Sequence, residues 1–295
     1  MNFMEKLDSA ILKSNSLLCV GLDSAIEKLP AHLKSECDNC SPTKSNSELK
    51  SHSDFLKAKE NAIFEFNRAI IDATADIVCA YKPNSAFYEA LGADGIRQLK
   101  MTFDYINEKY PHIITILDAK RADIGNTNDG YVKFAFEYLK ADAITLHPYL
   151  GSEALKPFLD RTDKGAIILC RTSNPGAGEF QDLSASGEPL YRTVAKKVAA
   201  QWNRNGNCML VVGATYPEEM KEIRAIVGDM TLLVPGVGAQ GGDVEKTVKA
   251  GLNSKRAGMV INSSRGIIFA GNGTDFAEKA RAEAIKTRDE INKYR

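Results

Sequence analysis

Four charged residues near the middle of the chain have the types and spacing needed for chemistry at an anionic carbon. Asp118, Lys120 and Asp123 lie within one short stretch, and Lys82 ends the apolar run that precedes it. Residues two apart on a strand point to the same face, so we expect Asp118 and Lys120 side by side. An ammonium held there can stabilise a developing carbanion and then protonate it. A purely structural network of ion pairs is the alternative interpretation.

A second group, nearer the C-terminus, is suited to binding a phosphate. A glycine-rich segment, 234–243, is followed one apolar run later by Ser-Arg-Gly. The candidate ligands are Pro235, Gly236, Gly238, Gln240, Ser264 and Arg265. Glycines let backbone N–H groups converge on an anion, and Arg265 can add a bidentate charged contact. A plain turn is the alternative for the glycines alone.

Strands must bring these residues together, and the sequence predicts eight of them. Apolar runs rich in β-branched residues alternate with stretches of helical periodicity. The predicted strands are 17–23, 77–84, 113–120, 143–148, 166–173, 208–214, 231–238 and 258–265. The predicted helices include 62–74, 95–108, 128–139, 190–202 and 217–227. Eight strand–helix units favour an α/β fold of the (β/α)8 or TIM-barrel type, formed by residues 1–295 as a single domain.

In such a barrel, residues at the C-terminal ends of the strands meet at one end, where chemistry is found. The predicted strand ends carry Asp23, Lys82, Asn84, Asp118, Lys120, His147, Ser173, Pro235, Gly236 and Arg265. A charge at the end of an apolar strand is costly unless it is paired or used. Because the cluster lies at strand ends on the catalytic face, beside a candidate anion site, we favour a catalytic cluster over the structural network. His147 could act as an acid or base, but a packed residue at the barrel rim is the simpler interpretation.

The composition excludes some classes of function. Lys plus Arg and Asp plus Glu number 38 each, so no general attraction to nucleic acid or acidic membranes is expected. The first 14 residues predict an amphipathic helix rather than a signal peptide, and no apolar run is long enough to cross a bilayer. With cysteines that are expected to be reduced, these features predict a soluble cytoplasmic protein.

Residues 31–58, after the first predicted strand, are rich in Ser, Lys and Asn and lack periodicity. They predict a surface insertion. Cys37 and Cys40 have the spacing of a zinc knuckle, with His32 and His52 nearby. No second cysteine pair follows, so we expect a surface insertion and no bound metal.

Together these residues resemble the orotidine 5′-monophosphate decarboxylase family, along essentially the whole chain. The family's Asp-x-Lys-x-x-Asp motif stands here as Asp118, Lys120 and Asp123, and its lysine on the preceding strand stands as Lys82 in Tyr-Lys-Pro-Asn. The longer, type 2 subgroup is matched by Asp-Ala-Lys-Arg-Ala-Asp-Ile-Gly-Asn-Thr from residue 118 onward. The resemblance implies cofactor-independent decarboxylation of orotidine 5′-monophosphate to uridine 5′-monophosphate (UMP), the last step of de novo UMP biosynthesis.

The resemblance also implies individual roles in this reaction. Lys120 would donate a proton to C6 of the pyrimidine, while Asp23 and Lys82 would bind the ribose. Ser173 would contact the pyrimidine. Gln240 would bridge the pyrimidine and the phosphate.

The remaining implied roles concern the phosphate and a second subunit. Arg265 would hold the phosphate, and Ser264 stands where compact members have glycine. The family is a homodimer, in which Asp123 and Thr127 would reach into the partner's site.

Two rival functions stay open. One is a sugar-phosphate enzyme on the same barrel, which shares the motif but uses Mg2+ and needs an acidic ligand where Lys82 stands. The other is a barrel that binds phosphate without catalysis. Activity towards orotidine 5′-monophosphate in the presence of EDTA would separate all three.

Overall fold

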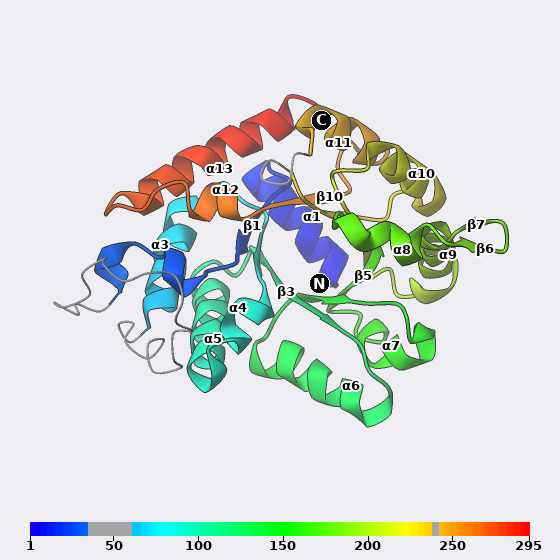
Figure 1. Cartoon of the computed structure of the whole chain (residues 1–295), viewed down its shortest axis with the longest axis horizontal. Helices are drawn as coiled ribbons and strands as arrows, with labels where there is room; N and C mark the ends of the chain where they lie inside the picture. The colour runs from blue at the N-terminus through cyan, green and yellow to red at the C-terminus, as the bar shows by residue number, and fades with distance from the viewer. Residues whose placement is uncertain (35–60, 238–241) are drawn as a thin grey trace, which may run out of the picture.

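The computed structural model of this chain describes residues 1–34, 61–237 and 242–295. Within them, eight parallel strands close into a barrel in the order β1–β10–β9–β8–β5–β4–β3–β2, which confirms the predicted (β/α)8 fold (Figure 1). The barrel strands are β1 (Leu18–Leu22), β2 (Ala80–Pro83), β3 (Ile114–Arg121), β4 (Ala143–Leu146), β5 (Gly165–Arg171), β8 (Cys208–Val212), β9 (Leu232–Pro235) and β10 (Met259–Ser263). Each corresponds to one of the strands predicted from the sequence.

Helices form a ring around the barrel (Figure 1). They are α3 (Ala62–Thr74), α4 (Ser85–Glu89), α5 (Gly92–Lys109), α6 (Gly125–Val132), η3 (Lys133–Tyr138), α7 (Gly151–Leu159), α9 (Leu190–Lys197), η5 (Val198–Trp202), α10 (Pro217–Val227), α11 (Val244–Gly251), α12 (Arg265–Ile268) and α13 (Phe276–Asn292). The predicted helices 62–74 and 217–227 coincide with α3 and α10. The latter begins with Pro217, whose missing N–H costs nothing at a first helical position.

The core lies inside the barrel and between the barrel and the helices. All residues of β1, β2, β4, β8 and β10 are buried, as parallel strands covered on both faces require. Outside the barrel, α3 buries Ile63, Phe66 and Ile70. The ring of Phe66 stacks on that of Phe276 from α13, with centroids 5.1 Å apart.

Helix α1 (Phe3–Ser14) closes the N-terminal end of the barrel and confirms the predicted amphipathic helix (Figure 1). Asn2 and Glu5 form a capping box at its start. The Phe3 N–H donates to the Thr162 carbonyl at 3.3 Å. A Cβ on Gly165, at the start of β5, would lie 2.5 Å from the Phe3 ring, so only glycine gives that ring room.

After β1 the chain forms two short helical turns, η1 (Ile26–Lys28) and η2 (Ala31–Leu33). The rest of the predicted insertion, with Cys37, Cys40 and His52, lies outside the described residues. The cysteines that are described are buried free thiols: Cys19, Cys79, Cys170 and Cys208. In the described ranges, no helix has both the length and the apolar character that crossing a membrane needs.

Candidate active site

The charged cluster predicted from the sequence is assembled at the C-terminal ends of β2 and β3. Lys82 Nζ lies 2.8 Å from Asp118 Oδ2, and Lys120 Nζ lies 2.7 Å from Asp118 Oδ1. The side chains of Lys82 and Asp118 are only 5% and 11% exposed, whereas that of Lys120 is 49% exposed. One buried carboxylate therefore holds two ammonium groups, and Lys120 is the one that a substrate can reach.

Burial and charge act in opposite directions on this cluster. Burial favours the neutral form of Asp118, but the charges and hydrogen bonds of Lys82 and Lys120 together outweigh it and hold the pKa of Asp118 well below its usual range. Burial likewise favours neutral Lys82, yet the charges of Asp118 and Asp23 raise the pKa of Lys82 above its usual value. At neutral pH, Asp118 is ionised and Lys82 is protonated.

Lys120 reaches Asp118 along a backbone that is not a regular strand. The register of β3 against β4 shifts between Leu117 and Arg121, and Lys120 has φ 48°, in the left-handed region. The predicted contact is confirmed, but the regular strand from which it was predicted is not. A non-glycine residue keeps this conformation only where its surroundings hold it.

Thr145 on β4 completes the cluster and was not singled out from the sequence. Its Oγ1 accepts the N–H groups of Ala119 at 3.0 Å and Lys120 at 2.9 Å, and it donates to Asp118 Oδ1 at 2.9 Å. In the sequence, a threonine within an apolar run is typical of a strand and does not by itself indicate a functional residue. The only signal was that a hydroxyl buried inside a barrel needs partners.

Asp23 and Asn84 lie at the same end of the barrel. The Asp23 Oδ1 atom is buried and has no hydrogen-bond partner in the described part of the chain. Such an oxygen is costly to leave without a hydrogen bond, which fits a role in accepting a hydrogen bond from a hydroxyl of a ligand. Asn84 bridges to the Asp118 backbone, and its side-chain oxygen accepts the Ala86 N–H as the N-cap of α4.

Asp123 lies in the loop after β3, as predicted. Its Oδ1 accepts the Ile124 N–H at 2.7 Å, and the Asn128 side chain binds its backbone. Among the ion pairs of the described residues, none joins Asp123 to Lys82 or Lys120, so it stands apart from the cluster. Thr127, in α6, is exposed.

The candidate phosphate ligands lie at the ends of β9 and β10. Pro235 ends β9, and Gly236 has φ 98°, a conformation that favours glycine. Arg265, the first residue of α12, is exposed and makes no ion pair with any described residue, so its guanidinium is available to an anion. Gly238 and Gln240 lie outside the described residues.

Ser264, which precedes Arg265, packs tightly against β1. Its Oγ donates to the Gly21 carbonyl at 3.1 Å. A Cβ on Gly21 would lie 2.8 Å from Ser264 Cβ, so the serine fits because residue 21 is glycine. The Ser264 hydroxyl therefore binds within the chain, and its side chain secures the segment that carries Arg265.

The segment after β5 carries Ser173 and contains secondary structure of its own. It holds η4 (Pro175–Ala177), α8 (Gly178–Gln181) and the hairpin of β6 (Ser184–Ala185) and β7 (Glu188–Pro189), none of which was predicted from the sequence. Buried Arg171, which ends β5, anchors this segment through Asp182 at 3.3 Å and lies over the Tyr216 ring at 4.0 Å. An arginine that ends an apolar run is unusual, and Arg171 was not singled out from the sequence.

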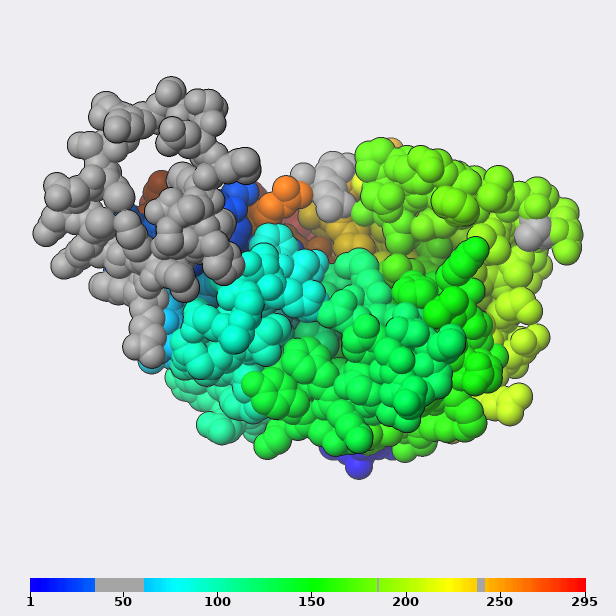
Figure 2. Space-filling model, turned by 60° about the horizontal axis from the view of Figure 1, so that its bottom comes forward, coloured from blue at the N-terminus to red at the C-terminus, as the bar shows by residue number. Residues whose placement is uncertain are grey.

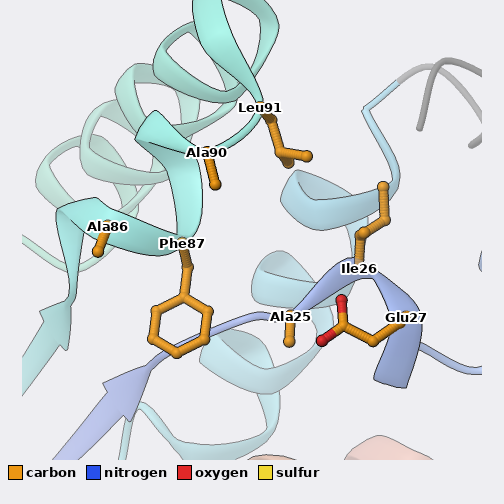
Figure 3. A pocket seen from close by; sticks show the side chains of 7 residues that line it. All are labelled: Ala25, Ile26, Glu27, Ala86, Phe87, Ala90 and Leu91. Carbon is orange, nitrogen blue, oxygen red and sulfur yellow. The ribbon is translucent and has the colours of Figure 1, made fainter. Parts of the chain in front are cut away.

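The surface is hollowed between the segment after β2, cyan in Figure 2, and the segment after β5, green. A separate cavity of about 230 Å³ lies between η1 and α4 (Figure 3). Its lining residues are Ala25, Ile26, Glu27, Ala86, Phe87, Ala90 and Leu91. None of the charged cluster lines it, so we do not assign it to the substrate.

Known proteins resemble this chain along nearly its whole length. Residues 16–280 match the "Orotidine 5'-phosphate decarboxylase / HUMPS family" model. The orotidine 5'-phosphate decarboxylase of Azoarcus sp. (strain BH72) is 50% identical over 295 residues, which cover 100% of both chains. That of Cellvibrio japonicus is 50% identical over 292 residues, covering 99% of this chain and 98% of the relative.

Solved structures agree with these relatives. The OMP decarboxylase of Leishmania donovani superposes with a TM-score of 0.80 at 35% identity, covering 100% of this chain and 99% of its own. The orotidine 5'-monophosphate decarboxylase from Methanocaldococcus jannaschii, complexed with the inhibitor BMP, gives a TM-score of 0.61 at 25% identity. That match covers 78% of this chain and 94% of the other.

Proposed function

The chain belongs to the orotidine 5′-phosphate decarboxylase family, and from this premise we propose how its residues convert orotidine 5′-monophosphate to UMP and CO2. It is a carboxy-lyase of UMP biosynthesis. The observation that carries the proposed mechanism is the cluster of Lys82, Asp118 and Lys120, in which two ammonium groups share one buried carboxylate.

The chemical difficulty is a carbanion at C6 of the pyrimidine, which forms as CO2 leaves. We assign Lys120 to that carbon, because its ammonium is half-exposed while Asp118 fixes its direction at 2.7 Å. A fixed cation there stabilises the growing negative charge and then supplies the proton that gives UMP. The step balances, because the electron pair of the broken C6–CO2 bond takes up the proton from Lys120 to form the C6–H bond.

Asp118 contributes in a second way. Its carboxylate lies near the expected position of the substrate carboxylate, and two like charges about 4 Å apart repel by roughly 4 kcal/mol at an effective dielectric of 20. This repulsion fades as the substrate carboxylate becomes neutral CO2, so the transition state is favoured over the bound substrate. The lowered pKa of Asp118 supports this role, because the carboxylate keeps its charge throughout.

The other predicted residues would hold the substrate away from the reacting carbon. Asp23, whose buried Oδ1 has no hydrogen-bond partner among the described residues, and Lys82 would bind the ribose hydroxyls. Asn84 and Ser173 are assigned to the nucleotide from the adjoining strand ends.

The phosphate would lie at the opposite wall of the site. Pro235, Gly236, Gly238 and Gln240 are assigned to it together with Ser264 and Arg265. The exposed guanidinium of Arg265, which makes no ion pair within the described residues, supports the assignment.

We also propose that the enzyme is a homodimer in which Asp123 and Thr127 enter the partner's site. Asp123 makes no ion pair with its own cluster, and exposed apolar side chains follow the ends of β3 and β4. Ile124 is 60% exposed, Tyr149 85% and Leu150 42%. Exposed apolar surface of this kind marks interfaces between subunits. The buried free thiols support a location in the cytoplasm.

Mixing two inactive variants tests the dimer. If Asp123 serves the partner, Lys120→Met and Asp123→Asn subunits together form one intact site in each mixed dimer, and equal mixing restores about a quarter of wild-type activity. Either variant alone stays inactive. No recovery after denaturing and refolding the mixture would show that Asp123 acts in its own subunit.

The function itself is tested by the loss of orotidylate absorbance at fixed enzyme concentration, with and without EDTA. We expect equal rates in both conditions. Loss of activity with EDTA would favour the Mg2+-dependent sugar-phosphate enzymes. No turnover in either condition would refute the proposed reaction and leave the barrel that only binds phosphate.

A further inference from the structure

We propose that Thr145 is a positioning residue that sets the Lys120 ammonium and the Asp118 carboxylate in their working geometry. A hydroxyl has one hydrogen to donate and two lone pairs to accept with. Thr145 Oγ1 accepts N–H groups from Ala119 and Lys120, so its hydrogen must go to Asp118 Oδ1. Its whole hydrogen-bonding capacity is thereby spent on three consecutive residues, 118–120.

The backbone of these three residues departs from a regular strand. The register of β3 against β4 shifts there, and Lys120 holds a left-handed φ of 48° that costs energy in a residue with a side chain. The two N–H groups bound by Thr145 belong to residues inside that irregular segment. Without an acceptor, they would be left unpaired in a part-buried site, and the segment would relax.

The same hydroxyl also acts on the charged group. It donates to Asp118 Oδ1, the oxygen that accepts the Lys120 ammonium at 2.7 Å. Thr145 is 1% exposed and lies on a strand, so this geometry is held by the barrel rather than by a loop. Backbone and carboxylate of the catalytic segment are thus fixed by one side chain that need not touch the substrate.

The inference rests on the proposed function, because it assumes that Lys120 acts at C6. The chain offers a matched control at the other end of the same two strands. Thr115 on β3 is fully buried, and its Oγ1 donates to Asp142 at 3.1 Å and accepts the Asp142 N–H at 3.1 Å. Thr115→Val removes an equally buried hydroxyl that binds an aspartate but lies far from Lys120.

The experiment measures kcat and KM for orotidine 5′-monophosphate, and the affinity for UMP, in Thr145→Val, Thr145→Ser and Thr115→Val. Valine keeps the shape of threonine and removes its hydrogen bonds, so we expect kcat to fall about 100-fold, as small displacements of a catalytic group do. KM and UMP affinity should change less than about threefold, because the ribose and phosphate contacts lie elsewhere. Thr145→Ser should restore kcat to within about threefold of wild type, and Thr115→Val should leave it unchanged.

The outcomes separate the two claims. A wild-type protein without turnover overturns both the proposed function and the role of Thr145. An active wild type with a Thr145→Val kcat within about threefold overturns the role of Thr145 alone. Equal losses in the valine and serine variants, or in Thr115→Val, also overturn it. If Thr145→Val does not fold, Thr145→Cys, whose thiol is a weak hydrogen-bonding group of similar size, must show a reduced kcat, and wild-type kcat there counts against the proposal.

Discussion

The two ends of the β3–β4 pair carry nearly the same set of side chains. At the C-terminal end, Asp118 binds a threonine of the neighbouring strand and the Lys120 ammonium. At the N-terminal end, Asp142 binds the Thr115 hydroxyl and backbone and the Lys6 ammonium at 2.6 Å. A buried aspartate held by a threonine and a lysine therefore does not by itself define an active site.

The two groups differ in the exposure of the lysine and in the number of ammonium groups that share the carboxylate. Lys6 comes from α1, is 28% exposed, and ties that helix over the closed end of the barrel. Lys120 is 49% exposed on a left-handed backbone, and a second ammonium, Lys82, shares its carboxylate. The first arrangement is complete and stabilises the fold, whereas the second holds a cation ready at an open surface.

Two arginines repeat the contrast. Arg224, on α10, gives all five of its N–H donors to the carbonyls of Gly228, Met230, Gly251 and Gly258, which lie near the starts of β9 and β10. Arg265, at the ends of the same strands, has no ion-pair partner among the described residues. We expect the first to support the fold and the second to bind the substrate.

The largest effect should come from the paired lysines. Lys120→Met should lower kcat about 10⁴-fold, because it removes both the cation and the proton at C6. Lys6→Met, which removes an ammonium from the same kind of pair, should leave kcat unchanged and lower the free energy of unfolding by about 1–3 kcal/mol, because Asp142 loses its counter-charge. Steady-state kinetics measures kcat, and urea unfolding measures the free energy of unfolding, for both variants. Comparable activity losses in the two variants would remove the distinction between the ends.

The barrel and the charged cluster were predictable from the sequence for physical reasons. Continuous apolar runs predict strands covered on both faces, and a charge that ends such a run must pair or act. Asp118, Lys82 and Lys120 meet as predicted because neighbouring β2 and β3 both end there.

The features that escaped prediction depend on contacts between strands. The left-handed backbone of Lys120 and the hydrogen bonds of Thr145 arise from the register of β3 against β4, which no single segment encodes. Thr145 and Thr115 look alike in the sequence, and only the barrel places one beside Lys120. The opposite roles of Arg224 and Arg265 likewise follow from which end of a strand each one faces.

A smaller loss is expected from Arg265→Ala, which should reduce kcat/KM about 100-fold through loss of a charge-assisted contact to the phosphate. Binding and catalysis should weaken together, because binding energy at the phosphate helps to position the reacting carbon. Adding inorganic phosphite with a substrate that lacks the phosphate should stimulate the wild type more than the variant. Near-wild-type turnover of Arg265→Ala at subsaturating substrate would place the phosphate elsewhere.

The matching arginine at the closed end should show the smallest effect on activity. Arg224→Met leaves four carbonyls without their donor, and we expect the free energy of unfolding to fall by about 3 kcal/mol. Arg224→Lys keeps the charge, but an ammonium lacks the planar fork that lets arginine reach all four carbonyls. We therefore expect its free energy of unfolding to lie between those of the wild type and Arg224→Met. Below the unfolding transition, kcat and KM of both variants should equal those of the wild type. A variant that keeps its stability in urea but loses kcat would show that the closed end also takes part in catalysis, which the complete pairing of Arg224 argues against.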